Sequence, residues 1–376
     1  MFKSQRSWLV IGIILILGLI YIRPHPLAAK FAVPYIADEA KDSKPIFESQ
    51  FIPQPPSLLA AHSATIEVLP NNDLIALWFA GSHEGHPDVK IYQSIFHNNK
   101  WEMGHAVVSP QSLSKQIHAL IYKLGNPVVY LAQNKELHLF VVSVGVIGGW
   151  SGSSINHLIS TDFGQTWHIL PKLNISPLFN LSNLVRTNPV GLTDGGFYLP
   201  IYQELYHTYP QLIRFDASGN FVDMVRLNTL GDTLQPSVVP LNIDHALVFM
   251  RNKARTNDIL YMQKTNDGAV TFSEPTATNL TNHDSSLVVA RISNNQLLMV
   301  HNPDNRSKLN LAISNDEGKT WKDVYTLEDT KNGEFSYPAM QIHGDMIDIL
   351  YTWQRKKIKH IRFNKTWLNN IIGDKR

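Results

Sequence analysis

The chain has 376 residues, of which 44% are hydrophobic and 17% are charged, and its formal net charge is +2 at pH 7. This length and composition allow a large buried core, and the near-neutral charge predicts no nucleic-acid partner. The absence of cysteine excludes disulfides, a thiol nucleophile and a cysteine metal site.

The N-terminal region is a separate hydrophobic segment. Lys3 and Arg6 precede an apolar run over residues 8–22, a pattern typical of a signal anchor or a signal peptide. Residues 1–23 are therefore expected to form one hydrophobic helix. The helix either anchors the protein in the inner membrane, facing the periplasm, or is cleaved after export. Residues 24–45 are rich in proline and are expected to be a tether.

Short apolar stretches separated by turn-forming residues occupy the rest of the chain. The first two stretches, residues 65–69 and 74–79, flank a turn sequence at 70–73 and predict a β-hairpin. Residues 111–124 are expected to form one irregular or partly helical insertion. No long helical period competes with the strands, so the domain over residues 46–376 is expected to be all-β.

One turn sequence occurs three times, at residues 160–167, 265–272 and 314–321. In each copy an Asp can accept backbone N–H bonds, a Gly can take a positive φ and an aromatic residue can anchor the turn in the core. The closing aromatic residues extend to a series spaced by about 50 residues, which is typical of propeller blades. The series is Trp101, Trp167, Phe221, Phe272, Trp321 and Trp367. The sequence therefore predicts a six-bladed β-propeller preceded by one N-terminal hydrophobic helix.

Two sets of polar residues invite a functional interpretation that the pattern does not favour. His83, Glu84, His86 and Asp88 are dense enough to suggest a metal site, but they lack the helical His-Glu-x-x-His spacing and suit a hydrogen-bonded loop equally well. No metal and no cofactor are therefore expected. The aspartates of the repeated turns are expected to be structural, on the outer rim: Asp162, Asp267 and Asp316.

The repeated turns, the stretch Trp78–Ile91 and the stretch Glu334–Ala339 together resemble the sialidase (neuraminidase) superfamily. They are most similar to its bacterial BNR or Asp-box repeat proteins, described as predicted exo-α-sialidases. The resemblance covers nearly all of the chain after residue 45. It implies a sialidase-like propeller with its active site on the axis, at one face.

The resemblance also implies a chemistry. Family sialidases hold the substrate carboxylate with three arginines and use a tyrosine nucleophile activated by a glutamate, together with an aspartate acid/base. A neutral nucleophile suits an oxocarbenium-like transition state beside a carboxylate, and arginine offers a permanently charged, bidentate clamp.

Each family role is carried over to a residue of this chain that occupies the matching context. Tyr337, within a Ser-Tyr-Pro sequence, is the expected nucleophile, and Glu204 is the expected group that activates it. Glu84 and Asp88 are candidates for the acid/base or for hydrogen bonds to sugar hydroxyls. An equally weighted alternative is that Tyr337 only packs between blades.

The expected substrate-binding residues include one departure from the family pattern. The family begins with a Phe/Tyr-Arg-Ile-Pro motif, whereas Phe51–Pro53 lacks the arginine and His62 stands at the first-blade axial position. Tyr202, beside Glu204, can stack on a sugar. Three arginines near strand ends can converge on the axis, although each could instead solvate the surface: Arg251, Arg306 and Arg355.

These residues predict an exo-glycosidase that removes a terminal acidic sugar, sialic acid or a related one, from a glycan or oligosaccharide by a retaining mechanism. The missing arginine leaves open another carbohydrate-active enzyme, a different glycosidase or a lyase. A non-catalytic glycan-binding protein of the cell envelope is a third possibility. Membrane contact is expected through the N-terminal segment only.

Overall fold

The structure is a computed structural model. It describes residues 12, 28–34, 36, 43–146, 149–175, 182–254 and 256–374. The N-terminal hydrophobic helix expected over residues 1–23 therefore lies outside the described residues, apart from Gly12. Within these described stretches, no helix is long and apolar enough to cross a membrane.

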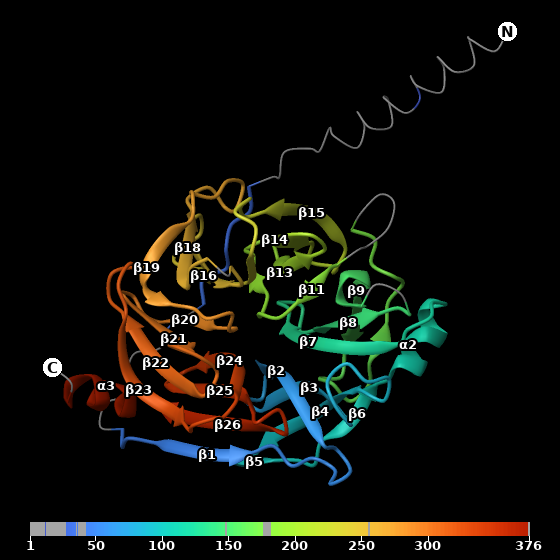
Figure 1. The fold of residues 1–376 in the computed structure, drawn as a ribbon, viewed down its shortest axis with the longest axis horizontal. Helices are drawn as coiled ribbons and strands as arrows, with labels where there is room; N and C mark the ends of the chain where they lie inside the picture. Colours follow the sequence, from blue (N-terminus) through green and yellow to red (C-terminus); the bar gives the residue numbers. More distant parts are fainter. Residues whose placement is uncertain are drawn as a thin grey trace.

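Six antiparallel sheets are arranged around a common centre (Figure 1). Blade 1 contains β2 (Ala60–Val68), β3 (Leu74–Gly81), β4 (Lys90–His97), β5 (Lys100–Trp101) and β6 (His105–Val108). Blade 2 contains β7 (Lys123–Leu131), β8 (Leu137–Val144), β9 (Ser153–Ser160) and β10 (His168–Ile169). Blade 3 contains β11 (Leu184–Val185), β12 (Val190–Gly191), β13 (Phe197–Glu204), β14 (Thr208–Phe215) and β15 (Phe221–Arg226).

The remaining blades follow the same order from the centre outwards. Blade 4 contains β16 (Thr233–Pro240), β17 (Ala246–Asn252), β18 (Ile259–Thr265) and β19 (Thr276–Thr281). Blade 5 contains β20 (Val288–Ser293), β21 (Gln296–His301), β22 (Lys308–Ser314) and β23 (Lys322–Asp329). Blade 6 contains β24 (Phe335–His343), β25 (Met346–Trp353), β26 (Lys357–Asn364) and β1 (Phe47–Phe51). The predicted all-β, six-bladed propeller is confirmed.

The last blade is closed by a strand from the beginning of the domain. β1 pairs antiparallel with β26, with Phe47 opposite Phe363. Trp367 lies not in a blade turn but in the C-terminal helix α3 (Lys365–Asp374), with its ring 4.5 Å from that of Phe47. The outer strand of blade 6 therefore comes from the N-terminal side, a closure that the repeat spacing did not indicate.

Helix α2 (Pro110–Ile117) forms the expected partly helical insertion and lies outside blades 1 and 2. Ser109 caps it: its hydroxyl accepts a 3.0 Å bond from the backbone N–H of Ser112. Proline at the first helical position fits because its missing N–H has no partner there in any helix. A short 3₁₀ helix, η1 (Gly149–Gly152), leads into β9.

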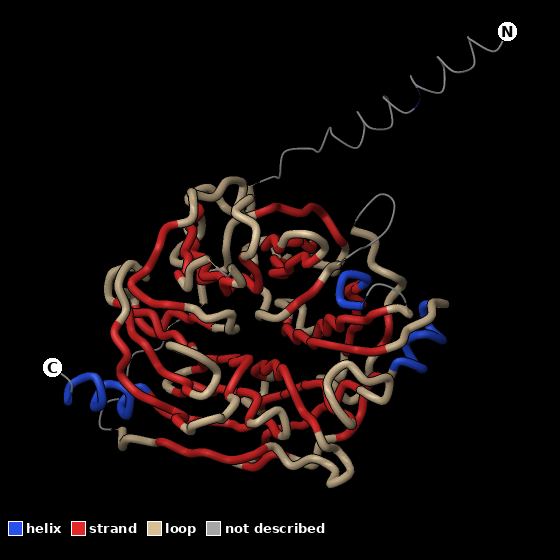
Figure 2. The backbone as a smooth tube through the Cα atoms, in the orientation of Figure 1, coloured by secondary structure: helices blue, strands red, loops and turns tan. Residues whose placement is uncertain are grey.

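Apolar side chains gather in six clusters, one at each seam between neighbouring blades. Each sheet thus buries both faces, which explains why β3 and β8 are buried over their whole length. Figure 2 shows that strands form most of the body and that helices α2 and α3 lie at its edge. Burial of this apolar area provides most of the driving force for folding, at about 25 cal/mol per Å².

The three repeated turns have the same internal bonding. The Asp162 carboxylate accepts bonds of 2.9 Å from the backbone N–H and 2.6 Å from the hydroxyl of Thr166, and one of 2.7 Å from the Ser160 hydroxyl. These bonds, those from Thr166 first, lower the pKa of Asp162 to about 2. Asp267 and Asp316 bond their own turns in the same way.

The innermost strands carry a bulge that aims side chains at the centre. In β2, β16 and β24 the pairing register slips at equivalent places. The bulged residues Ser63, Gln235 and Tyr337 have φ values of 55°, 51° and 54°. A left-handed conformation costs a non-glycine residue on the order of 1 kcal/mol. The ring of blades offsets this cost, and two of these side chains, Gln235 and Tyr337, line the cavity on the axis.

Residues 28–34, which belong to the expected tether region, lie against blades 3 and 4. The backbone N–H of Phe31 donates a 2.7 Å bond to the carbonyl of Ile243, and its side chain is fully buried beside Tyr198. Gly268 has a φ of +69°, and a Cβ there would collide with the carbonyl oxygen of Ala29. This segment contacts the face that carries the β16–β17 turn, where the repeated turns also lie.

Candidate functional site

A cavity of about 210 Å³ opens on the axis, at the face where the innermost strands begin. Tyr202 from blade 3 and Tyr337 from blade 6 both line it, which places it at the centre of the ring. Predicted residues from two further blades also line it: Glu84 from the loop after β3 and Arg251 from β17. The fifth is Glu204, at the end of β13.

Tyr337 lies among positive charges. Its phenolic oxygen is 3.3 Å from Nη1 of Arg251. The guanidinium carbons of Arg186 and Arg306 lie 5.3 Å and 5.4 Å from its ring centre. Burial raises the pKa of Tyr337, but the charges of Arg251 and Arg306 outweigh burial, so that the net pKa is below its usual value. This environment stabilises the phenolate form more than water does for an ordinary tyrosine.

Arg251 is held in one orientation by three partners. Its Nε and Nη2 donate to the same carboxylate oxygen of Asp284, both at 2.8 Å. Its Nη1 donates to the side-chain oxygen of Gln235 at 3.2 Å as well as to Tyr337. Only 7% of Arg251 is exposed. The fixed guanidinium therefore presents one edge to the phenolic oxygen.

Arg306 and Arg355 share the carboxylate of Glu334, a residue of the family-like stretch Glu334–Ala339 to which the sequence assigned no role. Glu334 bonds Nη1 of Arg306 at 3.3 Å through one oxygen and Nε of Arg355 through the other. Glu84 pairs with the opposite end of Arg355. Burial raises the pKa of Glu334, but the bond and charge of Arg355 outweigh this and hold it below the usual range. A chain of ion pairs between arginine and glutamate side chains thus joins blades 5, 6 and 1.

Arg186 is a fourth arginine near the axis, also missed from the sequence. Its guanidinium donates to the backbone carbonyls of Ala64, Tyr337 and Pro338 and is 1% exposed. No ion pair joins it to a carboxylate in the described part of the chain. Burial lowers its pKa to about 10, which leaves it charged at neutral pH. Arg186 therefore ties blade 3 to blades 1 and 6 and adds positive charge beneath Tyr337.

Glu204 and Tyr202 line the opposite wall. The Glu204 carboxylate pairs with Lys253 at 3.3 Å, and no hydrogen bond to Tyr337 is present among the described residues. The Tyr202 hydroxyl accepts bonds from Gln235 at 3.2 Å and Asn126 at 3.4 Å. Burial, followed by the charge of Glu204, raises the pKa of Tyr202, so it remains neutral. The two tyrosines thus lie in opposite electrostatic environments.

His62 lies under Tyr337, at a ring distance of 4.5 Å in an edge-to-face arrangement. It is 2% exposed, and neither ring nitrogen has a hydrogen-bond partner in the described structure. Burial and then the charge of Arg355 hold its pKa well below the usual value. A neutral, buried imidazole cannot clamp a carboxylate as an arginine would.

Asp88 lies in the loop between β3 and β4 and does not line the central cavity. Its carboxylate accepts 3.2 Å bonds from the backbone and hydroxyl of Ser82 and lies 2.8 Å from the His86 ring. These bonds shape the loop, which carries Glu84 to the cavity. Across the described residues, no group of three or more histidine and acidic side chains could hold a metal ion.

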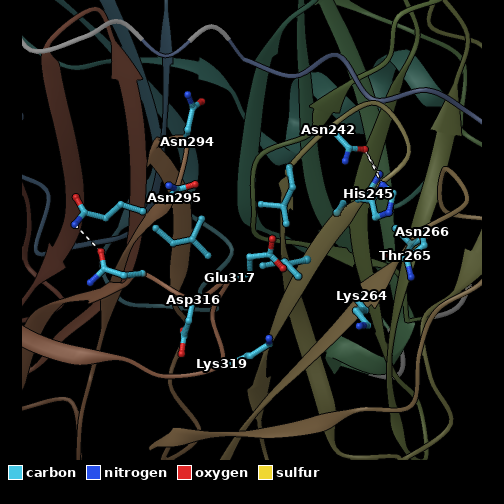
Figure 3. Close-up of a pocket in the computed structure, with 16 residues that line it drawn as sticks. Asn242, His245, Lys264, Thr265, Asn266, Asn294, Asn295, Asp316, Glu317 and Lys319 are labelled. Carbon is cyan, nitrogen blue, oxygen red and sulfur yellow. Dashed lines mark hydrogen bonds between the residues drawn. The ribbon is translucent and has the colours of Figure 1, made fainter.

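A second cavity of about 650 Å³ lies between blades 4 and 5, at the face opposite the arginines. Figure 3 shows that turn residues line it, among them Asn242, His245, Asn294 and Asp316. Because it is lined by residues of the structural turns and is separate from Tyr337, we place the candidate active site in the smaller cavity on the axis.

A sequence signal could have revealed Gln235. It precedes a proline at the bulge of β16, as Tyr337 does at the bulge of β24. Both residues, at the bulge of an innermost strand, line the cavity on the axis. Arg186 lies before the inner strand β12 in a similar context, two residues ahead of Asn188-Pro189.

Comparisons with known proteins agree with this architecture. The model of the BNR repeat-like domain matches residues 72–349. A comparison with curated proteins found no match. The solved Hadza microbial sialidase Hz136 superposes with a TM-score of 0.68 at 16% identity, over 82% of this chain and 66% of that one. This chain thus spans less than two thirds of the sialidase's length.

Two other solved structures are similar over nearly their full length. A protein of unknown function from Dyadobacter fermentans has a TM-score of 0.67 at 14% identity, covering 84% of this chain and 98% of that one. Penicillium chrysogenum α-L-arabinanase, complexed with arabinobiose, has a TM-score of 0.63 at 14% identity, covering 86% and 99%. These likenesses show a common fold. The family match, over most of the chain, shows that this protein belongs to the BNR repeat-like domain family, with a sialidase-like propeller.

Proposed function

We propose that the protein is a retaining exo-glycosidase of the sialidase type that hydrolyses a terminal acidic sugar from a glycan. The observation that carries the proposal is the contact of the Tyr337 hydroxyl with Arg251 inside the axial cavity. The sialidase and arabinanase neighbours, whose names describe glycan-cleaving enzymes, support the same class of reaction.

In the proposed reaction, the Tyr337 oxygen attacks the anomeric carbon and the bond to the leaving group breaks. The cationic surroundings of Tyr337 favour the phenolate needed for this attack. Glu204 is the proposed proton acceptor when the phenol starts neutral, since it lines the same cavity. Water then attacks the anomeric carbon, the bond to the Tyr337 oxygen breaks and the proton of water passes to the deprotonated acid, which gives net retention.

The acid that protonates the leaving oxygen is proposed to be Glu84. Both acid candidates lie in the loop between β3 and β4, but Glu84 lines the cavity whereas Asp88 bonds Ser82 within the loop. We propose that the substrate carboxylate meets Arg251 and Arg306, since the neutral His62 leaves the first clamp position without a charge. Sialic acid or another acidic sugar would fit this reduced clamp.

The experiment is an assay for the sugar that the full-length protein releases from α-linked sialosides, with uronosides and arabinan in the same panel. Replacement of Tyr337 by Phe should reduce turnover by at least about a thousandfold, since a covalent nucleophile is lost. Tyr325→Phe is the matched control, because Tyr325 packs on Phe47 at the outer edge of the ring. Turnover that survives in Tyr337→Phe would rule out this nucleophile.

A second candidate is a different carbohydrate-active enzyme, a lyase or another glycosidase. It is favoured by His62, a neutral imidazole against the ring of Tyr337 where an arginine was expected. A lyase would release an unsaturated product that absorbs near 230 nm, and a different glycosidase would act only on other sugars of the panel. If the folded protein binds glycans but releases none, a binding role replaces both.

A further inference from the structure

A groove of about 640 Å³ lies beside the axial cavity, between blades 5 and 6 on the same face. The loop before β22 and the loop before β24 form its two sides. It shares Arg306, Glu334 and Arg355 with the charged network around Tyr337. The groove and the axial cavity meet where Arg355 of the groove pairs with Glu84 of the cavity and where Arg306 lies 5.4 Å from the ring centre of Tyr337.

Hydrogen-bond donors and positive charges dominate the groove. Arg306, Lys331 and Arg355 face a single carboxylate, Glu334, whose two oxygens already bond the two arginines. The Glu84 carboxylate pairs with Nη1 of Arg355. Lys331 is exposed, and no ion pair joins it to another described residue. The groove thus has one cation available for an added negative charge.

Neutral side chains complete the lining. Asn305, Ser307 and Asn332 add amide and hydroxyl groups that can bond sugar hydroxyls. The two loops are tied together: the backbone N–H of Phe335 donates to the backbone carbonyl of Arg306 at 2.7 Å, and that of Thr330 donates to the backbone carbonyl of Ser307 at 3.1 Å. These bonds give the groove a defined shape in the absence of a ligand.

The opposite side of the axial cavity has a different character. There the wall consists of Trp150 and Leu184, with the amide of Asn126 and the neutral Tyr202. The Glu204 carboxylate lies on the same side, and Lys253 already pairs with it at 3.3 Å. Negative charge on a bound glycan is therefore favoured towards blades 5 and 6 and not towards blades 2 and 3. The uneven charge of the two walls therefore favours one orientation of a bound acidic glycan.

We propose that this groove binds the sugar unit next to the one that is cleaved, and that this second unit also carries a carboxylate or a sulfate. The substrate is then an acidic chain with at least two consecutive anionic sugars, rather than a neutral glycan with one acidic cap. This inference rests on the proposed glycosidase function and specifies its substrate class.

The test compares substrates that differ only in the second unit. All three substrates end in the same terminal sialic acid. The second unit carries a carboxylate in α2,8-linked disialic acid, no charge in sialyllactose, and a sulfate in a sialyllactose that is sulfated on galactose. For the full-length protein we expect KM to be about three- to fivefold lower for the substrate with a charged second unit that the groove accepts than for sialyllactose. Lys331→Gln should remove this advantage, and Lys331→Arg should keep it.

Two controls separate the groove from general effects. Lys319→Gln changes an exposed lysine at the cavity on the other face and should leave the KM ratios unchanged. KM for sialyllactose and kcat for all substrates should be unaffected by Lys331→Gln. A KM ratio that is equal for charged and neutral substrates, or insensitive to Lys331, overturns the proposal.

Calorimetric binding of the same three saccharides to the Tyr337→Phe protein distinguishes the two proposals. Charge-dependent binding that Lys331→Gln abolishes, without release of any sugar by the native protein, would retain the groove and refute the glycosidase. Release without charge discrimination would refute the groove alone. Absence of both binding and release would refute both.

Discussion

The phenolic oxygen of Tyr337 lies 3.3 Å from Nη1 of Arg251, although the two residues are 86 positions apart in the chain. Because Arg251 is also bonded to Asp284 and Gln235, it cannot turn away from the phenol. The contact is therefore a fixed feature of the ring of blades, and its electrostatic effect can be measured without knowledge of the substrate.

Tyr337 should ionise below the ordinary tyrosine pKa of 10.0, because Arg251 and Arg306 outweigh the effect of burial. A titration followed by absorbance at 295 nm should show an early step equal to one tyrosine. Tyr337→Phe should remove this step, whereas Tyr325→Phe should keep it. Identical titration curves for the two variants would contradict the electrostatic argument.

The stability of the protein should fall at acidic pH because of a buried histidine pair. His138 and His157 lie 2.8 Å apart between blades 2 and 3. Burial lowers the pKa of His138 to about 4, and burial together with His138 lowers that of His157 to about 3. The unfolded chain, with pKa near 6.5, then binds more protons than the folded one.

The contribution of the two neutral histidines to the free energy of unfolding should therefore be complete above about pH 6.5. It should be lost as the pH falls towards 4 and then 3. It amounts to on the order of 3 kcal/mol for His138. Urea unfolding at several pH values should show a shallower pH dependence for the double variant His138→Gln/His157→Gln. The exposed His168→Gln is the control, and equal slopes for all three proteins would exclude the pair as the cause.

Asp316→Ala should reduce the free energy of unfolding by about 2 kcal/mol, because the Asp316 carboxylate accepts bonds from Ser314 and from the backbone and hydroxyl of Thr320. Urea denaturation measures the change, with the neighbouring exposed Glu317→Gln as control. Any catalytic rate of the folded variant should be unchanged. A selective loss of rate without loss of stability would show that the turn is not merely structural.

Phe31→Ala should reduce the free energy of unfolding by about 3 kcal/mol, since a fully buried aromatic ring is removed from the seam between blades 3 and 4. Thermal unfolding tests this, with the 68% exposed Leu59→Ala as control. A chain that starts at Lys44 should also melt below one that starts at Ala28. Equal melting temperatures would mean that residues 28–34 contribute no stability.

The sequence was sufficient to predict the blade number because the repeated turns satisfy their own hydrogen bonds locally. Ser160, Asp162 and Thr166 form their bonds within seven residues, so the pattern is visible without tertiary information. The sixth aromatic anchor, Trp367, was assigned wrongly to a blade turn. Its true partner, Phe47, is brought to it by ring closure, which is a long-range event.

For the site, the sequence indicated residue types at strand ends but not their partners. Of the three arginines expected to converge on the axis, Arg251 bonds Tyr337, Arg306 lies 5.4 Å from its ring centre, and Arg355 pairs with Glu334 and Glu84. The partners Asp284 and Glu334 were missed, because pairing across blades depends on how the ring closes. Arg186 was also missed: its place before Asn188-Pro189 resembles that of Gln235 and Tyr337 before a proline, but its partners are backbone carbonyls, which the sequence does not identify.

The sharing of blade 6 between β1 and β26 has a consequence for how the domain loses its structure. A linear array of repeats can fray from its ends, one unit at a time. Here the first and last segments of the ring belong to the same sheet, so there is no terminal unit to lose. Withdrawal of β1 opens the ring itself, and we expect the blades to unfold together in one cooperative transition.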